Sequence, residues 1–302
     1  MVDFFKTFTL EDQAVLGRYL PRYGSGDCDL TVTSLVSRNA KRNLRFREYD
    51  GRYLVLERAL LGVETPVIVM PIGEPPVEQD LFDELASDAK AKKRPLIFYG
   101  ITQAMQPVLE KAYPLAQLAI EENPARWDYI YECRDFTELA GSHFHGKRNF
   151  IKRFYKACPE AKFVIYTPQR FEACMEFLES WYAEREPDPD LEQEFKAIEY
   201  VLRHWDDLSV FGGMLEEHGR ILGLTYGARC APDMLAVHIE KATRAVPGAY
   251  PALSQAFAQT LPPCVMYLNR EEDLGIPGLR KAKQDWHPIT QLKKGCIQVN
   301  GI

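Results

Sequence analysis

The feature that most constrains the fold of this chain is a weak internal repeat. Gly51 and Gly219 lie 168 positions apart, and Tyr99 and Tyr267 have the same separation. At this offset a glycine turn between two strand-like runs, a short apolar run, a helix-like segment and a second apolar run recur in the same order. The repeat therefore predicts two copies of one α/β unit.

Each half is expected to contain the same elements. Hairpins are predicted at residues 50–54 and 218–222, because glycine readily takes the positive φ of a tight turn. Helices are expected to begin near Phe82 and Tyr250. Short apolar runs predict buried strands at 66–70, 95–99, 234–238 and 264–268, and further helices are predicted at 140–156 and 191–204.

Length and composition narrow the class of protein. The 302 residues suffice for two domains without disulfides or a structural metal. With 37 basic and 43 acidic side chains the net charge is −6, which disfavours a protein that coats nucleic acid over its whole surface. Seven cysteines without a C-x-x-C pair indicate a reducing compartment. Because no apolar stretch suits an export signal or a transmembrane helix, we expect a cytoplasmic protein.

One stretch of the chain is locally basic. Residues 141–156 contain Lys147, Arg148, Lys152, Arg153 and Lys156 but no acidic residue. Cations at helical spacing bind the phosphate oxygens of a lipid headgroup, a cofactor or tRNA. A solvated helix face explains the same pattern. The pair His143 and His145 has no further ligand nearby at the spacing of zinc sites, so no metal is expected.

The second half carries the densest charges. Residues 269–283 alternate acids and bases directly after an expected strand, which suits a zwitterionic or phosphorylated substrate at a strand end, or a charged surface loop. The turn at 244–251 leads into a helix, whose N-terminal N–H groups suit an anion. The chain lacks G-x-G-x-x-G, Walker, H-E-x-x-H and G-x-S-x-G motifs. Dinucleotide oxidoreductases, P-loop enzymes and common serine hydrolases are therefore disfavoured.

At three stretches the chain resembles the C-terminal catalytic domain family of phosphatidylglycerol lysyltransferases. The first stretch is 127–149, in which the likeness is carried by Trp127–Tyr131, Leu139–Gly141 and Lys147–Asn149. The second stretch is His238–Lys241, and the third is Asn269–Gly275 together with Leu279–Lys283. The resemblance implies an α/β fold of two tandem GNAT-like domains, each a mixed, mostly antiparallel sheet flanked by helices. We predict domains at 1–160, including the basic linking helix, and at 161–302, with the active site. Two strands, ending near Glu240 and Leu268, are expected to part and admit the acyl donor.

The resemblance also implies a reaction. The protein is expected to transfer an aminoacyl group from aminoacyl-tRNA to a lipid headgroup or another amine or hydroxyl acceptor, without a permanently bound cofactor. A membrane surface is a further expected partner. The candidate catalytic residues are Glu240, as general base or amine-orienting carboxylate, Asn269 and Glu271. Candidates for binding the donor and its phosphates are Lys147, Arg148, Arg153, Arg244, Gly248 and Tyr250, and those for binding substrate are His238, Lys241, Arg270, Asp273, Arg280 and Lys283.

Two other functions remain open at this point. GNAT acetyltransferases usually carry a glycine where this chain has Pro247, so an acetyl-CoA-dependent N-acetyltransferase is an alternative that departs from the usual motif. The membrane-embedded portion of the full-length lysyltransferases is also absent, which leaves the acceptor open. The second alternative is a non-catalytic protein that binds RNA or anionic lipid through the basic helix.

Overall fold

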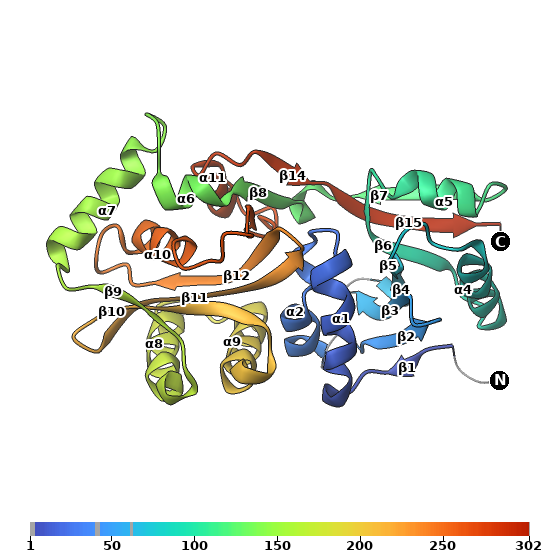
Figure 1. The fold of residues 1–302 in the computed structure, drawn as a ribbon, viewed down its shortest axis with the longest axis horizontal. Coiled ribbons are helices and arrows are strands. Elements are labelled where there is room, and N and C mark those ends of the chain that lie inside the picture. Colours follow the sequence, from blue (N-terminus) through green and yellow to red (C-terminus); the bar gives the residue numbers. More distant parts are fainter. Residues whose placement is uncertain (1–3, 40–42, 61–62, 302) are drawn as a thin grey trace.

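Two β-sheets lie end to end along the long axis of the molecule (Figure 1). The computed structural model describes residues 4–39, 43–60 and 63–301. Residues 1–3, at the N-terminus where no export signal is expected, lie outside it. The first sheet runs in the order β1 (Lys6–Thr7), β2 (Arg45–Tyr49), β3 (Tyr53–Leu60), β4 (Val63–Val69), β6 (Leu96–Thr102), β15 (Lys294–Asn300) and β7 (Gln117–Glu122), with β5 (Ile72–Gly73) paired to β3. The second runs β14 (Thr290–Leu292), β8 (Asp128–Glu132), β13 (Tyr267–Asn269), β12 (Met234–Ala242), β11 (Arg220–Ala231), β10 (Val210–Glu217) and β9 (Lys162–Ile165).

Helices flank both sheets. The helices near the first sheet are α1 (Gln13–Tyr23), α2 (Val32–Ser37), α4 (Gln79–Ala91) and α5 (Gln106–Ala112). Those near the second are α6 (Cys133–Glu138), α7 (His145–Ala157), α8 (Phe171–Ala183), α9 (Pro189–Arg203), α10 (Ala249–Ala258) and α11 (Pro277–Gln284). In Figure 1, α8 and α9 lie on one face of the second sheet and α10 on the other. Among the described residues no helix has both the length and the apolar character needed to cross a bilayer.

The internal repeat is confirmed by the order of elements. β2–β3 and β10–β11 are hairpins, and each turn places two successive residues at positive φ: Asp50 and Gly51 at 53° and 64°, and His218 and Gly219 at 49° and 80°. These are the conformations of a tight two-residue turn. A strand, a helix and a strand follow in both halves, as β4, α4 and β6 and as β12, α10 and β13.

Two elements begin several residues later than predicted. The strand expected at 264–268 begins only at Tyr267, because Val265 N–H bonds the carbonyl of Pro262 in a turn. The helix expected from residue 140 begins at His145, because Leu139 and Gly141 take positive φ and end α6 first.

The fold class predicted from the sequence is confirmed. β4–β6 and β12–β13 are parallel pairs, and the other pairings between described strands are antiparallel. The halves also share one core, since Leu35 of α2 packs in the same buried cluster as Leu178 of α8 and Leu202 of α9.

The two sheets exchange strands. β8 precedes the predicted boundary at residue 160 yet lies in the second sheet between β14 and β13, whereas β15, the last strand, lies in the first sheet between β6 and β7 (Figure 1). The division into domains at 1–160 and 161–302 stays a prediction. Each of the two sheets contains a strand from the other side of that boundary.

A buried ion cluster lies where the exchanged strands begin. Lys294 Nζ, at the start of β15, is 2.5 Å from Asp27 Oδ1 and 2.9 Å from Asp128 Oδ1, at the start of β8. Asn269, at the end of β13, donates to Asp128 Oδ2 at 2.8 Å and to the Gly26 carbonyl at 2.7 Å. These side chains are buried, and burial raises the pKa of Asp128 to about 7, an effect that the Lys294 ammonium opposes as the counter-charge of the acidic pair.

Replacing Lys294 by methionine should lower the free energy of unfolding by about 3–5 kcal/mol, because the buried acidic pair loses its counter-charge. Urea unfolding measures the change. The matched control is Lys293→Met, because the Lys293 side chain is exposed. This substitution should change the free energy of unfolding by less than about 0.5 kcal/mol. Equal effects of the two substitutions would contradict this assignment.

Candidate active site

A gap opens between the two parallel strands of the second sheet. β12 and β13 pair only through Met234–Tyr267, Leu235–Leu268 and Ala236–Asn269, after which β12 continues to Ala242. The chain after β13 follows β8 instead: Arg270 N–H donates to the Tyr129 carbonyl at 2.9 Å, and Tyr129 N–H donates to the Glu271 carbonyl at 3.1 Å. The strands therefore part where the family resemblance places the donor.

A β-bulge at His238 determines which face of the sheet the side chains beside this gap point to. In the pairing of β11 with β12, Tyr226 faces Ile239 and Gly227 faces Val237, which leaves His238 as the extra residue. Without a bulge, residues 238 and 240 would share a face. Instead Glu240 accepts a hydrogen bond from Ser254 of α10, whereas His238 faces α2.

On the α10 side, a salt bridge spans the gap. Arg270, just after β13, pairs with Glu240 of β12. The guanidinium also lies over the rings of Phe136 and Trp286, at 5.3 and 5.4 Å from their centroids. Lys147 of α7 reaches the same Trp286 ring at 4.6 Å. Burial lowers the pKa of Lys147, an effect that Asp285 opposes.

On the other side, a second pair spans the gap. His238 Nδ1 lies 2.9 Å from Glu271 Oε1, and His238 Nε2 lies 2.8 Å from Thr31 Oγ1. Glu271 takes a positive φ of 59°, and its N–H bonds Asn269 Oδ1 at 2.7 Å. Burial alone would raise the pKa of Glu271, but the His238 hydrogen bond and the positive charge of Arg38 hold it below its usual value.

The N-terminal half contributes charged groups that sequence reasoning missed. Arg38 lies at the C-terminal end of α2, 3.8 Å from Asp29, with 40% of its side chain exposed. Arg58 of β3 is buried, donates to Asp29 Oδ2 at 3.2 Å and lies over the Tyr99 ring at 4.2 Å. No motif marks these residues, because Arg38 comes close enough to Glu271 to lower its pKa only when the halves pack, and Arg58 contacts Asp29 and Tyr99 within the first half. The gap is thus lined from both halves.

The loop after β13 is held in place by three of the predicted residues. Asp273 accepts from Tyr129 Oη at 2.7 Å and from Arg280 Nε at 2.7 Å. Lys283 of α11 donates to the carbonyl oxygens of Arg270 and Glu271, so its role is to fix the loop backbone. Of the predicted catalytic residues, Asn269 belongs to the buried ion cluster and does not face the gap.

The predicted donor-binding residues do not gather at one point. Arg148 donates to the carbonyl oxygens of Leu139 and Gly141 and so stabilises the turn before α7. Arg153 and Arg244 are exposed. Tyr250 Oη accepts from Trp181 Nε1 at 3.2 Å.

The Lys241 side chain, predicted to bind substrate, contacts residues of α8 and α9. Its ammonium lies 2.5 Å from Glu194 of α9 and 4.2 Å from the centroid of the Trp181 ring. The roles assigned to all these residues from the sequence stay predictions.

Gly248, at the N-cap of α10, has a φ of 93° and lies against α7. A Cβ at this position would come within 2.1 Å of the Phe150 carbonyl oxygen. The backbone of α7 therefore covers the N-terminus of α10 at this point.

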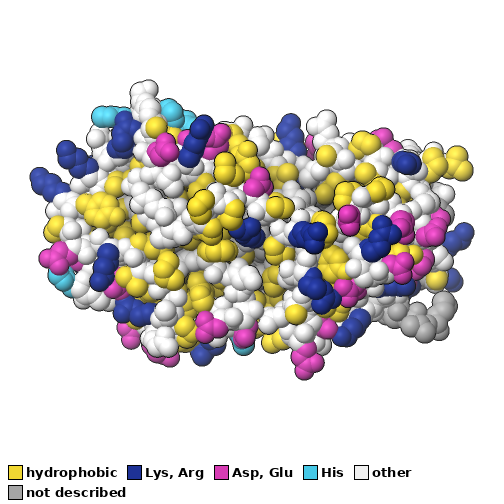
Figure 2. All heavy atoms as spheres, in the orientation of Figure 1, with side chains coloured by type: hydrophobic (Ala, Val, Ile, Leu, Met, Phe, Trp, Pro, Cys, Tyr) yellow, Lys and Arg dark blue, Asp and Glu magenta, His cyan; other side chains and the backbone are white. Residues whose placement is uncertain are grey.

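Basic side chains gather on the outer surface of α7. Lys152, Arg153 and Lys156 are exposed on α7, and Figure 2 shows dark blue side chains at the upper left of the molecule, where Figure 1 places this helix. Phe150 is also exposed on this helix. This surface suits a polyanion.

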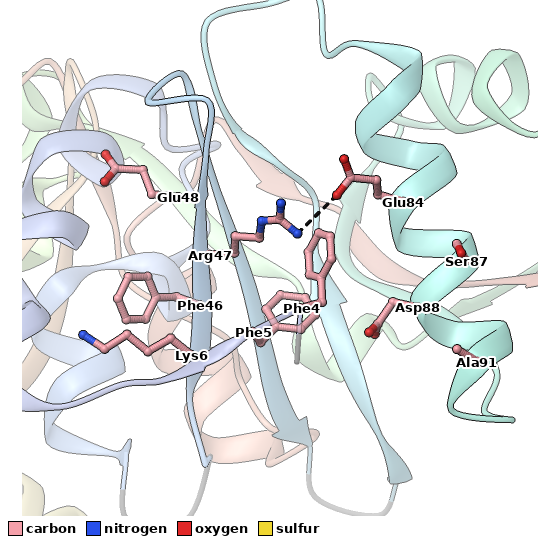
Figure 3. Close-up of a pocket in the computed structure, with 10 residues that line it drawn as sticks. All are labelled: Phe4, Phe5, Lys6, Phe46, Arg47, Glu48, Glu84, Ser87, Asp88 and Ala91. Atoms are coloured by element: carbon pink, nitrogen blue, oxygen red, sulfur yellow. Dashed lines mark ion pairs between the residues drawn. The ribbon is translucent and has the colours of Figure 1, made fainter. Parts of the chain in front are cut away.

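Two hollows in the surface lie away from the gap. A groove of about 680 Å³ lies between β2 and α4, where Arg47 covers the Phe4 ring and pairs with Glu84 at 3.2 Å (Figure 3). A second, of about 460 Å³, lies beside the turn before β13 and includes Glu132 and Met266. None of the predicted site residues lines either hollow.

Comparison with known proteins gives a consistent set of relatives. The family model described as phosphatidylglycerol lysyltransferase, C-terminal, matches residues 19–297. A solved structure of a conserved protein of unknown function from Bacteroides thetaiotaomicron is 30% identical, with a TM-score of 0.90 over 99% of this chain and 100% of that one. No curated protein sequence matches the chain.

Two more distant structures share the fold. The C-terminal domain of a proposed lysylphosphatidylglycerol synthetase from Agrobacterium fabrum has a TM-score of 0.66 at 16% identity, over 96% of this chain and 92% of that one. The L-PGS of Bacillus licheniformis has a TM-score of 0.66 at 13% identity, over 98% of this chain and 93% of that one.

Asp273→Asn should destabilise the protein by about 1–2 kcal/mol near pH 6. The Arg280 and Tyr129 hydrogen bonds lower the pKa of Asp273 from 3.8 to about 2, so its contribution is present above about pH 4 and is lost as the pH falls towards 2. Urea unfolding at pH 6 and pH 3 should show the difference from wild type narrowing at pH 3. Asp285→Asn, on an exposed residue, is the control, and a pH-independent difference for Asp273→Asn would contradict the prediction.

Proposed function

Since this chain belongs to the family of the phosphatidylglycerol lysyltransferase C-terminal domain, an acyltransferase family, we propose that it moves an aminoacyl group from aminoacyl-tRNA to an amine or hydroxyl acceptor. The observation that carries this proposal is the gap between β12 and β13, spanned by Glu240–Arg270 on one face and His238–Glu271 on the other. The family resemblance inferred from the sequence is confirmed; the donor and the acceptor are our proposals.

The gap supplies what acyl transfer needs. Beyond Ala236, β12 is no longer covered by β13, so its backbone groups on that side are available to a donor. A backbone N–H at such a place can stabilise the oxyanion that forms on the ester carbonyl. The carboxylates of Glu240 and Glu271 flank the opening, where they can orient an amine and take up its proton.

The surroundings of the N-terminus of α10 favour aminoacyl-tRNA over acetyl-CoA as the donor. Binding of the CoA pyrophosphate at this helix end would require free N–H groups there. In this chain Gly248 lies against Phe150 of α7, and Pro247, which has no N–H, precedes it. The exposed cations of α7 instead suit the phosphates of a longer polyanion.

Glu240 suits the role of an amine-orienting carboxylate better than that of a free base. Its oxygens accept from Ser254 Oγ and pair with Arg270, so it is held in one orientation. An entering ammonium group would meet a carboxylate already fixed in place. We propose a lipid headgroup, reached at a membrane surface, as one acceptor class, and the cytoplasm as the compartment because charged tRNA is found there.

Substituting Lys152, Arg153 and Lys156 together by alanine should weaken retention of labelled aminoacyl-tRNA on a filter. Loss of three phosphate contacts should lower the slope of log affinity against log salt by about two to three. The matched control is alanine at the exposed Lys90, Lys93 and Lys111, which should leave the slope unchanged. Displacement of the label by excess acetyl-CoA would favour the N-acetyltransferase instead, and retention without any transfer would favour a binding protein.

Glu240→Gln should reduce the turnover of aminoacyl transfer by about 100-fold, because it removes the charge that orients the acceptor. Transfer of label to an amine acceptor measures this, with the urea midpoint as a check on folding. Glu138→Gln, at an exposed position on α6, is the control. Unchanged turnover in folded Glu240→Gln would remove Glu240 from the mechanism.

A further inference from the structure

Three hydrogen-bonded side chains cross the junction between the two halves of the molecule. Thr31, fully buried at the N-cap of α2, lies 2.8 Å from His238 Nε2, and His238 Nδ1 lies 2.9 Å from Glu271 Oε1. Glu271 keeps 22% of its side chain exposed at the gap. Among the described residues Glu271 Oε2 has no hydrogen-bond partner, so this oxygen is the one available to a substrate.

The carboxylate of Glu271 decides the direction at one end of this chain of hydrogen bonds. Thr31 Oγ1 accepts from the N–H of Ser34 at 3.0 Å and, as a hydroxyl, holds His238 Nε2 either by donating to it or by accepting from it. An ionised carboxylate beside Nδ1 requires an N–H there. His238 therefore donates from Nδ1 to Glu271, while the Thr31 hydroxyl holds the other ring nitrogen.

We propose that Thr31 is a positioning residue, which acts through His238 to hold the Glu271 carboxylate towards the gap as the group that takes the proton of the acceptor. This inference rests on the proposed acyl transfer. The acceptor nitrogen or oxygen attacks the ester carbonyl carbon and forms the new bond to it, while its proton passes to Glu271 Oε2. The bond from that carbon to the ribose oxygen then breaks, and this oxygen takes the proton from Glu271.

The surroundings of Glu271 keep it ionised for this role. The charged and titratable groups that face it are Arg38 from α2, Cys28 from η2 (Cys28–Leu30), Tyr226 from β11, His238 and Lys241 from β12, Lys283 from α11, and Glu272 beside it. Without the Thr31 hydroxyl, His238 Nε2 loses the contact that fixes the orientation of the ring, so the imidazole can turn and take Nδ1–H away from the carboxylate. Loss of that hydrogen bond would raise the pKa of Glu271.

The experiment replaces Thr31 by valine, which keeps the shape and removes the hydroxyl. The ¹⁵N NMR shifts of the imidazole at pH 8 report which nitrogen carries the proton, with His238→Gln used to assign the signal. We expect Nδ1–H in wild type and in Thr31→Ser, and a loss of this preference in Thr31→Val. Thr33→Val is the matched control, because Thr33 is buried on the same helix and its Oγ1 has no hydrogen-bond partner among the described residues.

Glu271→Gln is the second variant, because Thr31 also caps α2 and its loss could unfold that helix. It leaves the cap intact and removes the carboxylate, so the Nδ1–H preference should again be lost. In the transfer assay, Thr31→Val should lower kcat/KM about tenfold at pH 5 and less at pH 8, since the acid limb of the profile moves to higher pH as the pKa of Glu271 rises.

Each outcome bears on the inference. Imidazole shifts that stay unchanged in Thr31→Val and Glu271→Gln would overturn it, as would an unchanged pH profile in a folded, active Thr31→Val. Shifts that move as expected, with no transfer from aminoacyl-tRNA to any acceptor by the wild type, would instead overturn the proposed function and leave the positioning of Glu271 by Thr31 standing.

Discussion

A lysine ammonium buried between two carboxylates fixes the geometry around the gap. Lys294, Asp27 and Asp128 meet where β8 and β15 enter sheets other than those of their sequence neighbours. Because the Asn269 amide bonds to Asp128, the end of β13 is fixed to the start of β8. The following residues then continue beside β8 and leave β12, so the ion cluster determines where the two parallel strands separate.

Because of the bulge at His238, polar side chains lie beside the gap on both faces of the second sheet. One extra residue changes the alternation of β12, so that Glu240 and His238 face opposite sides of the sheet. Each meets a side chain from the loop after β13, Arg270 on one side and Glu271 on the other. These side-chain bridges span the distance that backbone hydrogen bonds no longer close. Polar partners therefore line the opening on both faces, ready to be exchanged for those of a substrate.

The sequence allowed prediction of those features that local chemistry decides. The two hairpins follow from turns that need positive φ, and the order of strand and helix follows from apolar periodicity, so both were predicted correctly. The charged loop at 269–283 was located because its residues are adjacent in the chain. Thr31, Arg38 and Lys294 were missed because the groups that matter here, His238 for Thr31, Glu271 for Arg38 and Asp27 for Lys294, are distant from them in sequence. The strand exchange was missed for the same reason, since β8 and β15 have the same local pattern whichever sheet they join.

The interlocked sheets constrain how the protein acquires its structure during synthesis. β8 is made early, but its place between β14 and β13 cannot be completed until residues 267–292 have been translated. The first sheet likewise lacks the strand between β6 and β7 until residues 294–300 have left the ribosome. Until then unpaired strand edges remain in both halves, which is the state that favours pairing with other chains. The nascent chain therefore completes both halves together, once residues 267–300 have been translated, rather than one domain after the other.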